Sequence, residues 1–139
     1  MELSIALDYA RTRRNGVLVT MRRDGRPQLS NITFVVEPDG SVAISVTASR
    51  AKTVNASRDP RVSLHVTAED FWSYVVLDGL AVLTPPAANP ADDTVEQLVQ
   101  YYRTLRGEHP DWDDYRAAMV TEKRLVLRIR PDHAYGMIR

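Results

Sequence analysis

The sequence predicts a mainly β fold, a small antiparallel barrel with peripheral helices, in one domain that covers residues 1–139. Short β-branched and apolar runs recur along the chain, separated by turn signals such as "DGRP" and "EPDG". Strand and helix patterns do not alternate regularly, which argues against a doubly wound parallel sheet. The length suits one compact domain, and at this size an obligate dimer is equally easy to build.

The first third of the chain predicts a helix followed by strands. "LSIALDYARTRR" places apolar residues at helical spacing, and Asn15-Gly16 supplies a stop signal. Residues 16–47 predict a three-stranded antiparallel meander, in which "QLSNITFVV" forms the middle strand. A short helix follows in "SRAKTVNASRDPR" and closes at Asp59-Pro60, because the residue before proline disfavours helical geometry.

The remainder predicts three more strands and two helices. "RVSLHVT" alternates apolar and polar residues, and "FWSYVVLDGLAVLTPP" predicts one bent strand with a bulge at Asp78-Gly79. Helices are expected after Pro90 and after Asp111, each with an apolar face. "RLVLRIR" and "HAYGMIR" predict a strand and a last extended segment, so the count is about six strands.

Composition narrows the class of function. The formal net charge is zero, which gives no electrostatic footprint for nucleic acid or a membrane surface and favours a small-molecule ligand. Cysteine is absent, which excludes disulfides and thiolate chemistry and suits a reducing cytoplasm. No stretch approaches about 18 uncharged apolar residues, so we expect a soluble, cytoplasmic protein.

Most familiar catalytic signatures are missing. The sequence holds no G-x-G-x-x-G, G-x-x-x-x-G-K-[ST], H-E-x-x-H or G-x-S-x-G. The three histidines are far apart without ligand spacing, so no metal site is predicted. The acidic group at Asp111, Asp113 and Asp114 could serve acid/base chemistry, but a helix N-terminus explains it more simply. No catalytic residue is assigned from the sequence.

The start of the short helix carries cations where anions are favoured. Arg50 and Lys52 occupy its first turn, although a helix N-terminus has a partial positive charge. One interpretation makes Ser49 the N-cap and the cations solvent-exposed. The other makes this a phosphate site, because N–H groups, a guanidinium, an ammonium and the Thr53 hydroxyl together bind anions well. The local pattern leaves both open.

Two further segments suit a flat ligand. One predicted apolar strand contains the polar side chains of Gln28, Ser30 and Asn31. These groups either line a surface or contact a hydrogen-bonding ring such as a flavin. Trp72 and Tyr74 could form an aromatic wall, or belong to ordinary core or dimer packing.

In sequence order, "DGRPQLSNI", "SRAKTVNASRDPRVSL", "WSYVVLDGLAVLTPPA" and "GEHPDWDDYRAAMVTEKRLVLRI" closely resemble one family over nearly the whole chain. It is the pyridoxamine 5'-phosphate oxidase-like split β-barrel family (PPOX class), and within it the small enzymes that use the deazaflavin coenzyme F-420. The resemblance implies a six-stranded antiparallel split β-barrel of the FMN-binding type. It also implies a homodimer with two cofactor sites at the subunit interface.

The resemblance also implies a set of cofactor-binding residues. One strand would run beside the ring, and a second segment would meet the ring's other polar edge. A third would take the ribityl phosphate, and a fourth would approach from the partner subunit. In that order the segments are Gln28, Leu29, Ser30, Asn31 and Ile32; Ser45, Val46 and Thr47; Arg50, Ala51, Lys52 and Thr53; and Trp72, Ser73 and Tyr74.

The implied activity is that of an oxidoreductase in which coenzyme F-420 (8-hydroxy-5-deazaflavin) delivers hydride to an unsaturated or conjugated small molecule. FMN shares the ribityl phosphate, so an FMN-dependent oxidase or reductase is the alternative enzyme, and a non-catalytic flavin or deazaflavin carrier is the alternative class. No segment matches the C-terminal substrate signature of true pyridoxamine 5'-phosphate oxidases. Arg11, Arg13, Arg14, Arg22 and Arg23 could meet the acidic tail of F-420.

Overall fold

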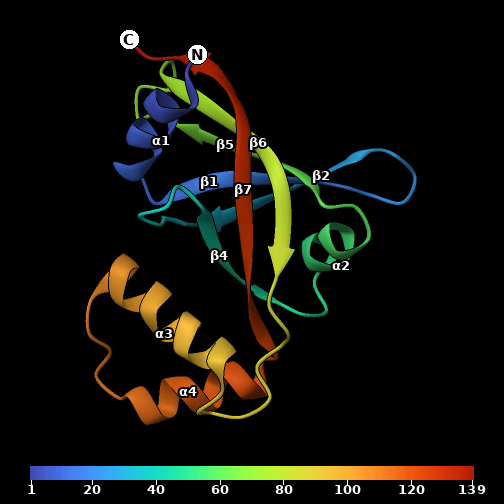
Figure 1. Ribbon diagram of the computed structural model, residues 1–139, viewed down its shortest axis with the longest axis vertical. Coiled ribbons are helices and arrows are strands. Elements are labelled where there is room, and N and C mark those ends of the chain that lie inside the picture. The colour runs from blue at the N-terminus through green and yellow to red at the C-terminus, as the bar shows by residue number, and fades with distance from the viewer.

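The computed structural model describes residues 1–139 as a curled antiparallel sheet of seven strands with four helices (Figure 1). In chain order the elements are α1 (Leu3–Arg11), β1 (Asn15–Met21), β2 (Pro27–Thr33), β3 (Val35–Val36), β4 (Val42–Thr47), α2 (Ala51–Arg58), β5 (Arg61–Thr67), β6 (Tyr74–Leu83), α3 (Asp93–Arg106), α4 (Trp112–Thr121) and β7 (Arg124–Met137). None of the helices has the length and apolar character needed to cross a membrane.

The strand order β2-β1-β5-β6-β7-β4-β3 confirms the mainly β, antiparallel prediction. The sheet curls until β2, at one end of this order, comes into contact with β4, near the other end. No backbone ladder joins β2 to β4, so the barrel is split between them. Figure 1 shows β7 running the length of the molecule between β6 and β4.

The predicted middle strand of the meander is broken at Phe34. Its two parts, β2 and β3, pair with β1 and β4 respectively, so the expected pairing of the second and third strands is confirmed for Val35 and Val36 alone and is wrong for β2. Phe34 is only 1% exposed, and its N–H donates to the Arg14 carbonyl at 2.8 Å. Burial of this ring turns the chain from one border of the split to the other, which a run of β-branched residues does not reveal.

The strand count also differs from the expected six. The two-residue strand β3 is additional, while "RLVLRIR" and "HAYGMIR" join into the single strand β7. The long β6 strand has its register shift between Asp78 and Gly79, as predicted. A Cβ atom at Gly79 would collide with the Arg130 carbonyl, which explains why glycine stands at this bulge.

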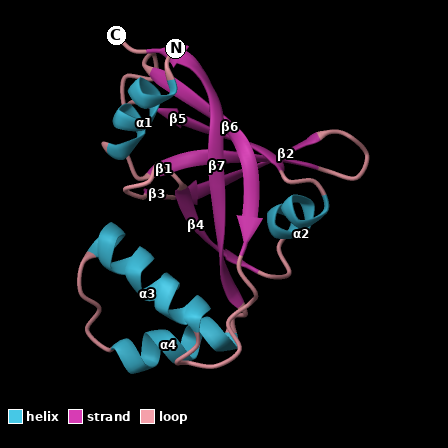
Figure 2. Ribbon diagram, in the orientation of Figure 1, coloured by secondary structure: helices cyan, strands magenta, loops and turns pink.

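Two hydrophobic cores hold the fold. The larger fills the barrel with side chains from all the long strands, and α1 adds the fully buried Ala6 and Ala10. The smaller lies between the α3–α4 hairpin and the outward-facing Ala43 and Val126 of β4 and β7. Figure 2 shows these two helices packed together at the end of the molecule away from α1. The hairpin thus flanks the β4 side of the split.

Candidate cofactor site

The N-terminus of α2 lies directly after β4 and has no capping side chain. Its N-cap is Arg50, in an extended conformation, and its first turn contains no acidic residue. The interpretation that Ser49 caps this helix is therefore wrong, because the helix begins one residue later than that interpretation requires. Helix dipole and cationic side chains here act in the same direction, and both favour an external anion.

Three cations gather around this helix start. Burial, followed by the nearby Arg50 and Arg124 charges, lowers the pKa of Lys52 from its usual 10.5. Neither Arg50 nor Lys52 forms an ion pair, whereas Arg124 contacts Glu122 at 3.2 Å. An excess of positive charge that depresses a lysine pKa is relieved when a phosphate binds. The site is thus electrostatically prepared for an anion.

Sequence reasoning missed Arg124. It belongs to β7 and lies opposite Thr47 in the β4–β7 ladder, which brings it beside the α2 start. Its sequence context, "EKRLVLR", is that of any strand bordered by charges. Only the pairing of β4 with β7 identifies it, and that long-range pairing leaves no local signal.

The other two members of the predicted phosphate segment differ in exposure. Ala51 is exposed and is the first residue of α2, where its N–H has no backbone partner. Thr53 is 3% exposed, and its Oγ1 donates to the Thr47 carbonyl at 2.7 Å. That bond uses the one hydroxyl proton to fasten α2 to the end of β4. Thr53 therefore orients the helix start and has no proton left to donate to a phosphate.

The predicted ring segment on β2 alternates between two faces. Gln28 and Ser30 lie opposite the buried Thr20 and Leu18 of β1, so they face the barrel side near the split. Leu29 and Asn31 point to the outer face, where Leu29 is 61% exposed. Ile32 shares the inner face and packs against the core. Since β2 pairs only with β1, its other edge borders the split.

The predicted segment on β4 also presents two different surfaces. Val46 is fully buried in the barrel core, so only its backbone can reach a ligand. Ser45 and Thr47 are half-buried on the opposite face of the strand. The structure therefore brings the β4 segment and the α2 start together, with β2 across the split.

The segment Trp72–Tyr74 lies elsewhere in the same chain. Tyr74 begins β6 and pairs with Thr67, while α2 leads into the opposite end of that ladder at Arg61 and Leu80. Ser73 is buried and its Oγ accepts from the Arg139 N–H at 3.0 Å, whereas Trp72 is 62% exposed. Figure 1 shows this end of β6 near the chain termini, away from α2. One protomer does not combine these residues with the helix start.

The outer face of the sheet has two neighbouring hollows, one lined mostly by polar residues and the other mostly by apolar ones. One hollow of about 470 Å³ includes Asn31, Ile32 and His65, and a neighbouring one of about 460 Å³ includes Leu29, His65 and Tyr135. The ladders carry a cross-strand row over four strands of this face, from Val17 through His65 and Val76 to Tyr135. The outward residues of the β2 segment therefore border a surface suited to covering by another molecule.

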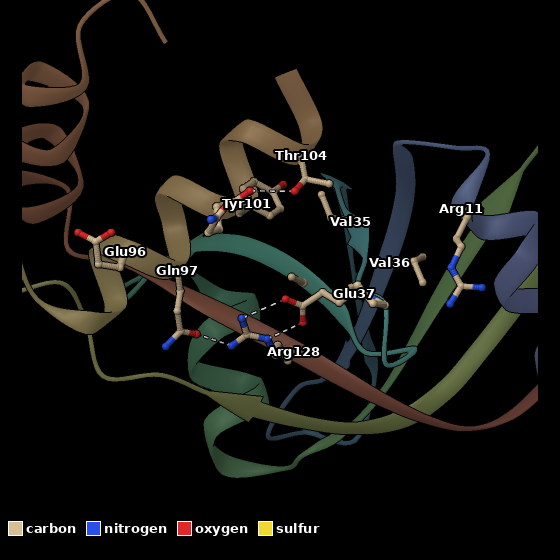
Figure 3. A pocket seen from close by; sticks show the side chains of 12 residues that line it. Arg11, Val35, Val36, Glu37, Glu96, Gln97, Tyr101, Thr104 and Arg128 are labelled. Atoms are coloured by element: carbon tan, nitrogen blue, oxygen red, sulfur yellow. Dashed lines mark hydrogen bonds and ion pairs between the residues drawn. The ribbon is translucent and has the colours of Figure 1, made fainter. Parts of the chain in front are cut away.

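A larger groove of about 610 Å³ lies between α3 and the β3–β4 side of the barrel (Figure 3). Its central cation, Arg128, is bound by Glu37 at 2.6 and 3.2 Å and by Gln97 at 2.5 Å. None of the residues predicted to bind the ring or the phosphate lines this groove, although Arg11, predicted for the acidic tail of F-420, does. Because Glu37 already neutralises Arg128, the groove offers a phosphate much less than the α2 start does.

The curled sheet with an open border between β2 and β4 defines a split β-barrel. The family model for pyridoxamine 5'-phosphate oxidase matches residues 7–137. The chain therefore belongs to the pyridoxamine 5'-phosphate oxidase family.

Solved structures share the fold at low identity. A structure described as an F420 reductase is 22% identical with a TM-score of 0.67, covering 88% of this chain and 89% of that one. A conserved hypothetical protein from Mycobacterium tuberculosis is 24% identical with a TM-score of 0.74, covering 98% of this chain and 84% of its own. A putative pyridoxamine 5'-phosphate oxidase from Listeria innocua is 17% identical with a TM-score of 0.69, covering 97% of each chain.

Proposed function

We propose that this protein is an F-420-dependent oxidoreductase that reduces an unsaturated or conjugated small molecule in the cytoplasm. The observation that carries the proposal is the uncapped, cationic start of α2 beside the split, with Arg50 and Lys52 lacking carboxylate partners. The family and the structural likeness to an F420 reductase support the choice of a flavin-like cofactor.

In this proposal the chain's residues bind and orient. Arg50, Lys52 and Arg124 hold the ribityl phosphate, with main-chain N–H groups at Ala51 and Lys52 as further donors. Gln28 and Ser30 on β2 and the backbone of Ser45–Thr47 on β4 border the ring across the split. Thr53 keeps α2 against β4 through its bond to the Thr47 carbonyl.

A second copy of the chain completes the proposed site. Trp72, Ser73 and Tyr74 cannot join the α2 start within one protomer, so in a homodimer they approach from the partner. The exposed apolar residues of the outer face, including Leu29 and Tyr135, give such a dimer an apolar surface to bury. The dimer also covers the hollows beside Asn31 and His65 and excludes water from them.

The proposed chemistry needs no nucleophile from the protein. A bound, reduced deazaflavin supplies hydride, and the chain's part is to position the substrate and keep water out. This agrees with a sequence that offers no triad and no isolated carboxylate pair for acid/base work.

Parallel titrations with F-420 and FMN test the proposal directly. We expect F-420 to bind with the higher affinity, measured by its fluorescence and by calorimetry, and to support single-turnover reduction of a quinone or an enone. Tight FMN binding with no response to F-420 would overturn the choice of cofactor and favour the FMN-dependent alternative. F-420 binding without hydride transfer to quinones, enones or tetrapyrroles would favour the carrier.

A further inference from the structure

Tyr101 of α3 reaches the border of the split from outside the barrel. Its hydroxyl donates to the Thr33 carbonyl at 3.0 Å and lies 2.9 Å from the Thr33 Oγ1. Thr33 ends β2, immediately after the proposed ring segment Gln28–Ile32. A side chain of the helical hairpin therefore fixes the last residue of the strand that borders the proposed ring.

The same side chain packs beside the other border of the split, against the smaller core that includes Ala43 of β4. Burial raises the pKa of Tyr101, and the Thr33 side chain and the Ser45 backbone act in the opposite direction. Ser45 is on β4, in the segment proposed to meet the ring's other edge. Tyr101 thus bonds to the end of β2 while its ring packs beside β4, although no backbone ladder joins these two strands.

The helix that carries Tyr101 is itself anchored. Gln97, one turn earlier on the same face of α3, accepts from Arg128 of β7 at 2.5 Å, and Glu37 holds the same guanidinium. Figure 3 shows Gln97 and Tyr101 on the side of α3 that faces the barrel, with Arg128 and Glu37 beneath. The anchored helix consequently fixes the position of the Tyr101 hydroxyl relative to the end of β2.

We propose that Tyr101 is a positioning residue that sets the spacing of β2 and β4, and thereby the fit of a flat cofactor ring between them. The ring of Tyr101 packs against the core beside β4, while its hydroxyl fastens the end of β2. This inference rests on the proposed function, since it assumes that the split holds the ring. It also predicts a property of the protein without cofactor, namely protection of the β2 and β4 amides.

The test compares Tyr101→Phe with Tyr115→Phe. Tyr115 also donates from a buried hydroxyl to a backbone carbonyl, that of Leu98 at 2.9 Å, but inside the α3–α4 hairpin. Tyr101→Phe removes the contacts with the Thr33 carbonyl and hydroxyl, and Tyr115→Phe removes the bond to Leu98. Both variants keep the aromatic ring, so we expect losses of thermal stability of the same order. Any difference between them isolates the contact with the split.

Hydrogen exchange, followed by mass spectrometry or NMR, is measured first without cofactor. We expect amides 29–33 and 45–47 to exchange about fivefold faster in Tyr101→Phe and to be unchanged in Tyr115→Phe. Affinity for F-420 is expected to fall about fivefold in Tyr101→Phe alone, with a shift in the absorbance maximum of the bound cofactor. Thr33→Val keeps the carbonyl acceptor. Its amide exchange and its affinity for F-420 should lie between those of the wild type and those of Tyr101→Phe.

Two results are diagnostic of failure. Equal exchange and equal affinity in the two tyrosine variants would overturn the role of Tyr101 while leaving the proposed function intact. If the wild-type protein binds no F-420, the proposed function fails, and faster exchange confined to Tyr101→Phe would still support the link between the strands.

Discussion

The N-termini of α2, α3 and α4 differ in what balances the partial positive charge of the helix. Asp92 caps α3 by accepting from the Val95 N–H at 2.9 Å, and Asp111 caps α4 by accepting from the Asp114 N–H at 3.1 Å. Helix α2 has no such cap and carries Arg50 and Lys52 instead. Helix α1 also lacks a capping bond but has Glu2 at its N-cap, so α2 is the helix whose start carries cations and no carboxylate. In the proposed function a ligand supplies that missing anion.

The difference follows the place of each helix in the fold. Helices α3 and α4 pack against one another and have a structural role in the smaller core. Helix α2 begins at the end of β4, where Arg124 adds a further charge. Functional sites often retain local features that lower stability. We therefore expect a helix start that lacks a cap, at a border of the split, where a ligand binds.

The largest expected change in cofactor affinity comes from giving α2 an acidic N-cap like those of α3 and α4. Arg50→Asp places a favoured N-cap residue at a position that already has extended geometry. Affinity for the phosphate-bearing cofactor should fall by about 3 kcal/mol, since a charged hydrogen bond is replaced by repulsion. The free energy of unfolding of the cofactor-free protein should rise by about 1 kcal/mol.

Calorimetric titration and chemical denaturation measure these two quantities separately. A decrease in both would contradict the view that α2 gives up helix stability for ligand binding.

Removal of Lys52 should be next in size. Lys52→Ala is expected to weaken cofactor binding by about 2 kcal/mol, the range for a charged hydrogen bond, with little change in stability. Arg130→Ala is the matched control, because Arg130 is exposed, forms no ion pair and lies six positions beyond Arg124 on β7. If both variants bound the cofactor as the wild type does, Lys52 would be an ordinary solvated cation.

Loss of a carboxylate cap should affect stability alone. Asp92→Ala removes the acceptor for Val95 and also for the N–H groups of Ala88 and Asn89, at 2.9 and 3.1 Å. We expect about 1 kcal/mol of destabilisation by denaturant titration, with cofactor affinity unchanged.

The pKa of Asp92 is lowered, first by its bond from Ala88, so this stabilisation should be lost as the pH falls through the folded pKa. A pH profile of unfolding for Asp92→Ala that matches the wild type at acid pH, and differs near neutrality, would support this account.

The smallest effect is expected from the pH dependence of Lys52. Its folded pKa lies below 10.5, so between the two values the unfolded chain binds more protons. This group therefore makes the cofactor-free protein more stable as the pH rises through the folded pKa. Inorganic phosphate should diminish that rise by favouring the charged ammonium. Unfolding measured from neutral pH to about pH 10, with and without phosphate, compares wild type with Lys52→Ala.

Local patterns were sufficient for most single elements. The alternation in Val62, Leu64 and Val66 predicted β5, and Asp78-Gly79 predicted the bulge in β6. The pairing of strands was harder to predict from the sequence, because it depends on contacts between distant segments. The break at Phe34 shows this, since the same apolar run serves two strands at opposite borders of the sheet.

The candidate site divides in the same way. Arg50 and Lys52 were visible because their charges conflict with the helix dipole, which is a local property. Arg124 and Tyr101 were not, because each reaches the split through the packing of β7 or α3 against β4. The role of Trp72–Tyr74 in a partner subunit stays a prediction.

The sequence by itself determined the mainly β class, the helix boundaries to within a few residues and the anomalous charge at the start of α2. These properties depend on periodicity, turn residues and electrostatics over a few neighbouring positions. The tertiary structure alone decided that β2 and β4 face one another without pairing, that Arg124 lies at the end of β4, and that Tyr101 bonds to the end of β2. Those contacts arise from the curl of the sheet and the docking of the α3–α4 hairpin, which are set by the two cores as a whole.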